Sequence, residues 1–214
     1  MDGTLIDSEP YWIAAETELA HRFGVDWTEE DGLSMVGNPL SVSGQLLRDR
    51  GVGLEVEEIV EYLLSRVTAQ VRERTPWQAD ARALLEAVLA AGIPCALVTM
   101  SYTRLANALL AQVPDAFAVV VTGDQVEHGK PHPEPYLTAA DQLGVPIERC
   151  VAIEDSPAGI GSALAAGAAT IGVQRVVPVA ADHRLTRLST LAGLDVEALG
   201  RIAAGERWDA LGPI

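Results

Sequence analysis

The spacing of hydrophobic and polar positions changes near residue 75. Before it, apolar residues recur three and four positions apart, which is the period of amphipathic helices, and no run resembles a strand. The pattern predicts helices over 8–24, 41–50 and 55–74. A polar loop is expected over 29–39. Ser8 is the expected N-cap of the first helix, whose apolar face the carboxylate of Glu16 interrupts. Residues 8–75 are therefore predicted to form a small all-helical unit.

From residue 76 onward, helical patterns alternate with short, continuously apolar runs. The apolar runs predict strands over 93–99, 117–122, 150–154 and 169–173. The helical patterns predict helices over 79–91, 103–112, 133–143, 157–166 and 195–203. Strands that are apolar on both faces indicate a parallel sheet covered by helices on both sides. We therefore predict an α/β fold. Its Rossmann-like, doubly wound parallel sheet core comprises residues 1–7 and 76–214, with the helical unit of residues 8–75 inserted.

Composition and charge limit the partners. A chain of 214 residues can bury one core together with a small accessory domain. Its formal net charge of −15 argues against nucleic acid and against an anionic membrane surface as partners. The same charge repels phosphate esters. A phosphate site would therefore need local positive charge from a metal ion, a lysine or helix N-termini.

Cysteine spacing and hydropathy point to the compartment. Cys95 and Cys150 have no spacing typical of a disulfide or metal pair, so we expect small, buried, free thiols. No apolar run reaches the ~18 residues that a membrane span needs, and no signal peptide is recognised. We expect a cytoplasmic protein that is a monomer or a weak dimer.

Polar residues follow the predicted strands where a ligand would bind. Asp2 would follow a first strand, Thr99 ends the second, Lys130 lies in the loop after the third, and the pair Glu154–Asp155 ends the fourth. In doubly wound sheets, ligands bind beyond the carboxyl ends of the strands. Carboxylates there suit a hard cation such as magnesium (Mg2+), and a lysine can hold both a phosphate oxygen and a nearby carboxylate. These residues predict a magnesium-dependent phosphoryl-transfer site.

Neighbouring residues complete the predicted site. The hydroxyl of Thr99 and the start of the following helix, with Ser101, can donate hydrogen bonds to phosphoryl oxygens. Asp2 can give a proton to the leaving oxygen and later take one from water. Gly3 allows the chain to turn sharply after Asp2.

Simpler interpretations apply to some of these residues. A Glu–Asp pair alone is more often a solvated turn, and threonine is common in strands. His128 and His132 flank the lysine and are expected to be surface histidines. Ser156 is expected to be the N-cap of the next helix.

Three motifs carry a resemblance to a known family: Asp2-Gly3-Thr4-Leu5-Ile6-Asp7-Ser8-Glu9-Pro10, Gly129-Lys130-Pro131-x-Pro133 and Ile153-Glu154-Asp155-Ser156-x-x-Gly159. In this order they resemble the haloacid dehalogenase superfamily, in particular the phosphatases and phosphomutases of its β-phosphoglucomutase-like branch. The resemblance spans nearly the whole chain. It implies magnesium-dependent hydrolysis of a small phosphorylated metabolite, a phosphate monoester such as a sugar phosphate, through an aspartyl-phosphate. It also implies that the helical unit is a mobile cap that closes over the substrate.

The resemblance assigns roles to residues of this chain. Asp2 would be the general acid/base, and its backbone carbonyl a magnesium ligand. Thr99 and Lys130 would bind the transferring phosphoryl group. Asp155 would be a metal ligand, and Glu154 a ligand or the partner of one.

The cap residues bear on the choice of substrate. Candidates for substrate selection are Glu9, Tyr11, Trp12, Gly37 and Asn38. The sugar-phosphate mutases of the branch place an arginine close after the corresponding glycine, whereas Asn38, Pro39 and Leu40 follow it here and the nearest arginine is Arg48. This favours hydrolysis. A phosphomutase stays open as an alternative, as does a non-catalytic protein of the same fold that acts as a binding or regulatory module.

One expected residue is not in the sequence. The family's loop reads Asp-x-Asp-Gly-Thr, and its first aspartate forms the aspartyl-phosphate. Met1 holds the middle position here. We expect the 214 residues alone to be inactive or impaired and to leave unpaired strand edges. We also expect the functional protein to carry roughly five to ten more residues, the length of a strand.

Overall fold

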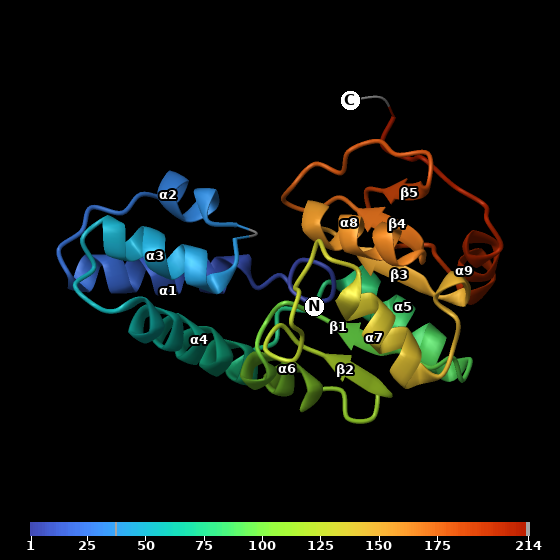
Figure 1. Ribbon diagram of the computed structural model, residues 1–214, viewed down its shortest axis with the longest axis horizontal. Coiled ribbons are helices and arrows are strands. Elements are labelled where there is room, and N and C mark those ends of the chain that lie inside the picture. The colour runs from blue at the N-terminus through green and yellow to red at the C-terminus, as the bar shows by residue number, and fades with distance from the viewer. Residues whose placement is uncertain (37, 213–214) are drawn as a thin grey trace.

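The computed structural model describes residues 1–36 and 38–212. The chain forms an all-helical part and an α/β part that lie side by side (Figure 1). Gly37, a cap candidate, lies outside the described residues.

The all-helical part contains α1 (Glu9–Arg22), α2 (Glu29–Ser34), α3 (Leu40–Asp49) and α4 (Val56–Glu73). Its core consists of apolar side chains that α1, α3 and α4 bury between them, including Leu19, Leu47, Ile59 and Leu63. Ile59 and Leu63 are four positions apart, so they lie on one face of α4. The three helices predicted before residue 75 are confirmed.

Helix α2 corrects the expectation of a loop over 29–39. Thr28 Oγ1 accepts a hydrogen bond from the Asp31 N–H at 3.2 Å, and an Asp31 carboxylate oxygen accepts one from the Thr28 N–H at 2.9 Å. This capping box satisfies two backbone groups at the start of the helix. A short, polar helix has little hydrophobic period, so the Thr-x-x-Asp spacing was its main sequence signal.

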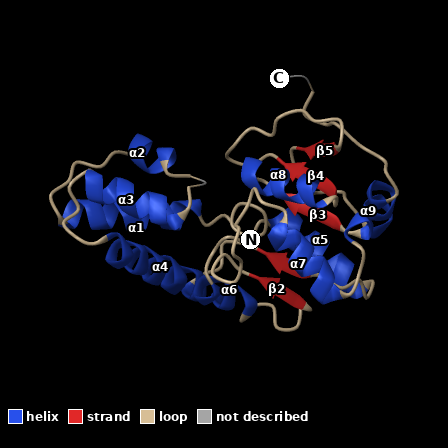
Figure 2. Ribbon diagram, viewed as in Figure 1, coloured by secondary structure: helices blue, strands red, loops and turns tan. Residues whose placement is uncertain are grey.

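The α/β part alternates strands and helices as predicted (Figure 2). The strands are β1 (Ala96–Val98), β2 (Val119–Val121), β3 (Val151–Glu154), β4 (Ala169–Val173) and β5 (Leu185–Leu188). The helices are α5 (Ala79–Ala90), α6 (Thr103–Leu110), α7 (Glu134–Leu143), α8 (Pro157–Ala166) and α9 (Val196–Ala203). A short 3₁₀ helix, η1 (Ile147–Arg149), precedes β3. All strand pairs are parallel, and the α/β class is confirmed.

Helices cover both faces of the strands. Val151 and Ile153 of β3 pack toward α5 and α9, whereas Ala152, which lies between them, packs toward α7 and α8. Successive side chains of a strand point to opposite faces, so a strand covered on both sides must be apolar throughout. The carboxyl ends of β1, β2 and β3 carry the polar residues of the candidate site.

The strands form two sheets where one was predicted. Among the described residues, β1 pairs with β2, and β3, β4 and β5 form a second sheet in that order. An apolar cavity of about 590 Å³ lies between β1 and β3, with Met1, Leu97, Val98 and Ile153 in its lining. Paired strands are about 4.8 Å apart, so strands that flank a cavity share no ladder of hydrogen bonds.

Strand β5 was not predicted, because its sequence contains Arg187. The guanidinium is buried, where Nη2 donates to Asp209 Oδ2 at 2.8 Å and Nη1 donates to the Val179 carbonyl at 2.9 Å. Buried charges need such partners. Both partners come from other segments, so the local pattern of residues 185–188 could not reveal the strand.

Two sequence expectations concern the whole chain. In residues 1–36 and 38–212, none of the helices combines the length and apolar character needed to cross a bilayer. Within the same residues, Cys95 and Cys150 are free, as expected, but they are only partly buried.

Candidate active site

The loop after β3 positions the predicted acidic pair. Glu154 ends the strand, Asp155 follows, and Ser156 Oγ accepts a hydrogen bond from the Gly159 N–H at 3.0 Å, which confirms Ser156 as the N-cap of α8. A Cβ atom on Gly159 would lie 2.0 Å from Glu154 Oε2. The Glu-Asp-Ser-x-x-Gly spacing therefore serves a local purpose: serine starts the helix, and glycine leaves room for the Glu154 carboxylate.

Lys130 joins the ends of β1 and β3. Its Nζ donates to the Val98 carbonyl at 3.0 Å and forms an ion pair with Glu154 Oε1. The Tyr136 hydroxyl donates to the same carboxylate oxygen. The Lys130 and Glu154 side chains are only 8% and 6% exposed. Burial tends to raise the pKa of Glu154, but the Lys130 ammonium and the Tyr136 hydroxyl hold that pKa below its usual range.

Asp2 lies between two serine hydroxyls. Its Oδ1 accepts a hydrogen bond from Ser8 Oγ at 2.6 Å, and its Oδ2 accepts one from Ser101 Oγ at 2.7 Å. Ser8 occupies the N-cap position of α1, as predicted, but its side chain makes no capping hydrogen bond. The Asp2 carboxylate is therefore held between the start of the helical part and the loop after β1.

Thr99 shapes that loop from within. It directly follows β1, its side chain is buried, and its Oγ1 accepts a hydrogen bond from the Ser101 N–H at 3.0 Å. Thr99 thus orients the loop that carries Ser101, whose hydroxyl donates to Asp2.

Asp155 packs against the loop that begins at Asp2. Its Oδ1 accepts a hydrogen bond from Thr4 Oγ1 at 2.6 Å. Gly3 has φ +70°, and a Cβ atom there would lie 1.9 Å from Asp155 Oδ2. Gly3 is therefore required both for the turn and for the close approach of this carboxylate. Burial raises the pKa of Asp155, and the negative charge of Glu154 adds to the effect.

The cap candidates lie at different distances from this group. Burial and the charges of Asp2 and Asp155 raise the pKa of Glu9 to about 7. Tyr11 donates its hydroxyl to the Arg74 carbonyl at 2.9 Å and so ties together the two ends of the helical part. In the described residues, no side-chain hydrogen bond connects Asn38 to the other candidates. The start of α3, which follows Asn38, lies on the side that faces the α/β part (Figure 1).

Sequence reasoning missed three contributors. Thr4, Ser8 and Tyr136 each bind a predicted site residue through a hydroxyl group. Thr4 and Ser8 belong to the motif that contains Asp2, so their position was a usable signal. Tyr136 lies in α7, and only the packing of α7 beside β3 reveals its contact with Glu154.

Comparisons with known proteins show the family of this chain. The sequence profile of the haloacid dehalogenase-like hydrolases matches residues 1–173. Hexitol phosphatase B of Escherichia coli (strain K12) is 30% identical over 211 residues, which cover 92% of this chain and 93% of that protein. Hexitol phosphatase A of the same strain is 36% identical over 177 residues, 81% of this chain and 80% of that protein.

A solved structure shares the fold. The crystal structure of CbbY from Rhodobacter sphaeroides in complex with phosphate matches with a TM-score of 0.80 at 26% identity, covering 93% of this chain and 96% of that one. The profile match extends from the Asp2 loop through β4 and includes every predicted site residue. By sequence and fold, this chain belongs to the haloacid dehalogenase-like hydrolase family.

Proposed function

We propose that this protein hydrolyses the phosphate monoester of a small sugar or polyol in a magnesium-dependent reaction. The observation that carries the proposal is that Lys130 is held at the carboxyl ends of β1 and β3, while Asp155, directly after β3, packs against the loop that begins at Asp2. The substrate class is supported by the relatives named hexitol phosphatases and by the phosphate in the CbbY structure.

The donor groups fit Mg²⁺. Burial raises the pKa of Asp155, because its carboxylate has lost part of its hydration, and a hard cation compensates for that loss. Asp155 and the backbone carbonyl of Asp2 would hold the ion, which when bound neutralises charge on the transferring phosphoryl group. The carboxylate of Glu154 is occupied by Lys130 and Tyr136. We therefore propose that Glu154 positions Lys130 and is not itself a metal ligand.

The other residues bind and move protons. Lys130 supplies a fixed positive charge for the phosphate oxygens, and its two contacts, Val98 and Glu154, keep the ammonium in place. Ser101, oriented by Thr99, presents a hydroxyl at the same edge. Asp2 protonates the leaving oxygen and later accepts a proton from the attacking water. The attack on phosphorus belongs to the first aspartate of the family's Asp-x-Asp-Gly-Thr loop, whose middle position Met1 holds here.

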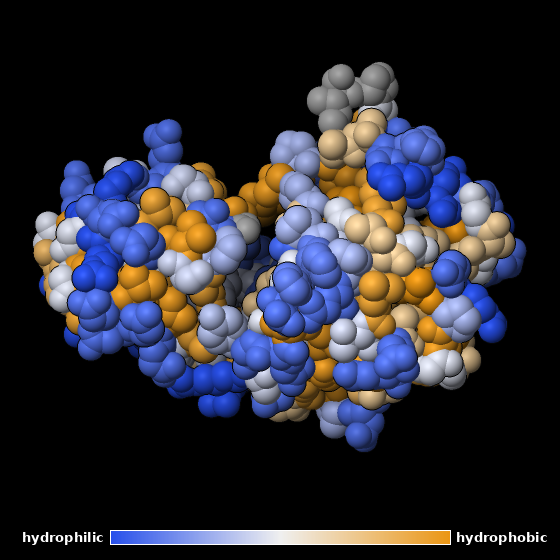
Figure 3. Space-filling view, in the orientation of Figure 1, coloured by the Kyte–Doolittle hydropathy of each residue, from blue (hydrophilic) through white to orange (hydrophobic). Residues whose placement is uncertain are grey.

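Residues 8–75 would close over the substrate as a cap. The surface is indented between the helical part and the α/β part (Figure 3). Glu9, the first residue of α1, would offer a carboxylate to sugar hydroxyls, and Asn38 precedes the end of α3 that faces the α/β part. Closure would exclude water from the bond that breaks.

Phosphate release from a panel of hexitol and hexose phosphates tests the proposal. The assay compares the 214 residues with a chain whose loop reads Asp-x-Asp-Gly-Thr, and we expect the 214 residues alone to be impaired. With the complete loop, we expect magnesium-dependent release that Asp155→Asn abolishes. Release that persists at full rate without magnesium would refute the metal assignment, and a requirement for a sugar bisphosphate would identify a phosphomutase.

A further inference from the structure

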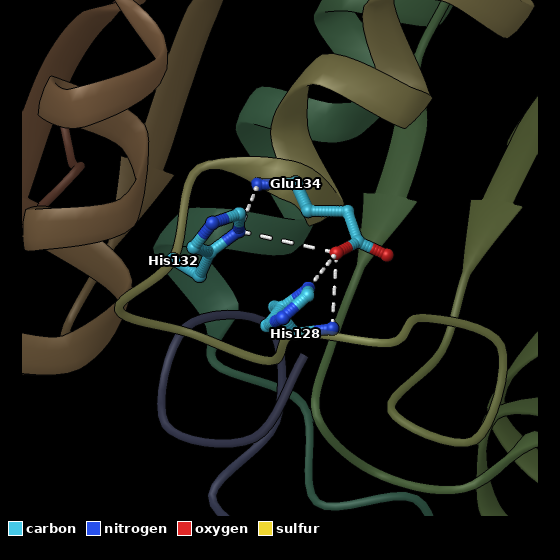
Figure 4. A group of neighbouring side chains, drawn as sticks. All are labelled: His128, His132 and Glu134. Atoms are coloured by element: carbon cyan, nitrogen blue, oxygen red, sulfur yellow. Dashed lines mark hydrogen bonds and ion pairs between the residues drawn. The ribbon is translucent and has the colours of Figure 1, made fainter.

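His128, His132 and Glu134 form a compact cluster on the outer side of the loop that carries Lys130. One nitrogen or oxygen donor atom from each residue lies within 4.8 Å of the other two. Both imidazole rings face the Glu134 carboxylate, which extends from the first residue of α7 (Figure 4). Lys130 itself points the other way, toward Val98 and Glu154. The cluster is therefore separate from the candidate active site.

Donor atoms in the cluster have the separations of metal ligands. Glu134 Oε2 lies 2.9 Å from His128 Nδ1 and 3.9 Å from His132 Nδ1. Two ligands on a tetrahedral ion with bonds of about 2.0–2.2 Å are about 3.3–3.5 Å apart. The observed distances lie on either side of that value. Side-chain rotations that release the hydrogen bond from the Glu134 N–H to His132 Nδ1 (3.3 Å) would bring all three atoms onto one ion.

The carboxylate of the cluster is already oriented. Glu134 Oε1 accepts a hydrogen bond from the Glu127 N–H at 2.8 Å, and Oε2 accepts one from the His128 N–H at 2.9 Å. Pro131 and Pro133 flank His132 and restrict its backbone. Supporting hydrogen bonds of this kind fix metal ligands in proteins. The loop therefore needs little ordering before it could bind an ion.

Exposure and chemistry indicate the kind of ion. The side chains of His128, His132 and Glu134 are 57%, 50% and 27% exposed, so an ion can reach them from solvent. Two imidazoles and one carboxylate are typical ligands of Zn²⁺ and neighbouring transition metals, whereas Mg²⁺ prefers oxygen. Three protein ligands leave a fourth position for water.

We propose that His128, His132 and Glu134 bind one divalent transition-metal ion of the zinc class at the rim of the active site. In the sequence, His128 precedes Lys130, and His132 and Glu134 follow it. An ion bound at this site would join all three side chains, whereas without it His132 Nδ1 accepts a hydrogen bond from the Glu134 backbone N–H at 3.3 Å. Because the ion binds the folded loop, it also stabilises the native protein against unfolding.

Calorimetric titration with ZnCl₂ tests the site. The protein is kept in excess Mg²⁺, so that the hard-cation site does not compete. We expect one Zn²⁺ per chain, and binding weakened roughly tenfold or more in His128→Asn, His132→Asn and Glu134→Gln. His183→Asn is the matched control, because His183 is 92% exposed beside Asp182, outside the cluster. It should bind zinc like the unchanged protein.

Two results would overturn the proposal. One is the absence of saturable zinc binding to the unchanged protein, and the other is unchanged one-to-one binding in the His128→Asn/His132→Asn double variant. Titration of the unchanged protein with Co²⁺ gives a measurement that needs no variant. We expect the visible absorption of four-coordinate cobalt with nitrogen and oxygen ligands, and a spectrum of hexa-aqua cobalt alone would contradict the site.

Discussion

Replacing Glu16 by glutamine should stabilise the protein by an amount that increases with pH. Glu16 lies on α1 with its side chain only 4% exposed, and within the described part of the chain its Oε2 has no hydrogen-bond partner. Burial, together with the charge of Glu9, raises its pKa from 4.5 to about 8. The folded protein therefore either binds a proton at Glu16 or buries an unpaired negative charge.

The sign and size follow from this pKa. Because the pKa is higher in the folded state, the protonated carboxyl contributes its full stability below pH 4.5 and loses it as pH rises to about 8. One pKa unit corresponds to about 1.4 kcal/mol. The loss of stability is therefore about 1 kcal/mol at pH 5, about 3 kcal/mol at pH 7 and on the order of 4–5 kcal/mol at pH 9. Glutamine resembles the protonated carboxyl and cannot ionise, so Glu16→Gln should recover these amounts.

Urea unfolding at pH 5, 7 and 9 measures the effect as the difference in unfolding free energy between variant and parent. The difference should rise steadily across the series. Glu73→Gln, at the exposed end of α4, is the control and should change stability by less than about 0.5 kcal/mol at each pH. A Glu16→Gln difference that does not depend on pH would refute the burial of a titrating carboxylate.

Three further predictions concern the loop after β3. In the chain with the complete Asp-x-Asp-Gly-Thr loop, Gly159→Ala should lower kcat/KM about a hundredfold, because its Cβ would displace the Glu154 carboxylate and with it Lys130; steady-state kinetics check this. Ser156→Ala should cost about 1 kcal/mol of stability through the lost N-cap of α8, measured by thermal unfolding, and an unchanged midpoint would contradict it. Asp155→Asn should abolish magnesium binding in a calorimetric titration while the far-ultraviolet circular dichroism spectrum stays the same, and retained binding would exclude Asp155 as a ligand.

Much of the architecture was predictable because its signals are local. The change from helical period to alternating strands and helices predicted both parts of the molecule, and apolar runs marked β1 to β4 before any contact was known. Lys130 and Asp155 could be selected because each follows a predicted strand, and Asp2 because of the motif in which it lies. Backbone geometry then brings strand ends to one edge of a sheet.

Other features depend on residues far apart in the chain. Arg187 can occupy a strand only because Asp209 and the Val179 carbonyl meet its guanidinium. His128 and His132 were expected to be ordinary surface histidines, and their exposure agrees with that, but their grouping with Glu134 depends on how the loop folds back onto α7. Neither arrangement leaves a periodic signal in the sequence.

By itself, the sequence determined the α/β class, the helical insert and the residue types of the candidate site, because propensity, period and motif spacing act between neighbouring residues. Tertiary structure alone decided that Ser8 and Ser101 hold Asp2, that Tyr136 joins Lys130 at Glu154, and that β1 and β3 flank a cavity. These contacts link segments as much as about a hundred positions apart. They form only when packing fixes where each segment lies.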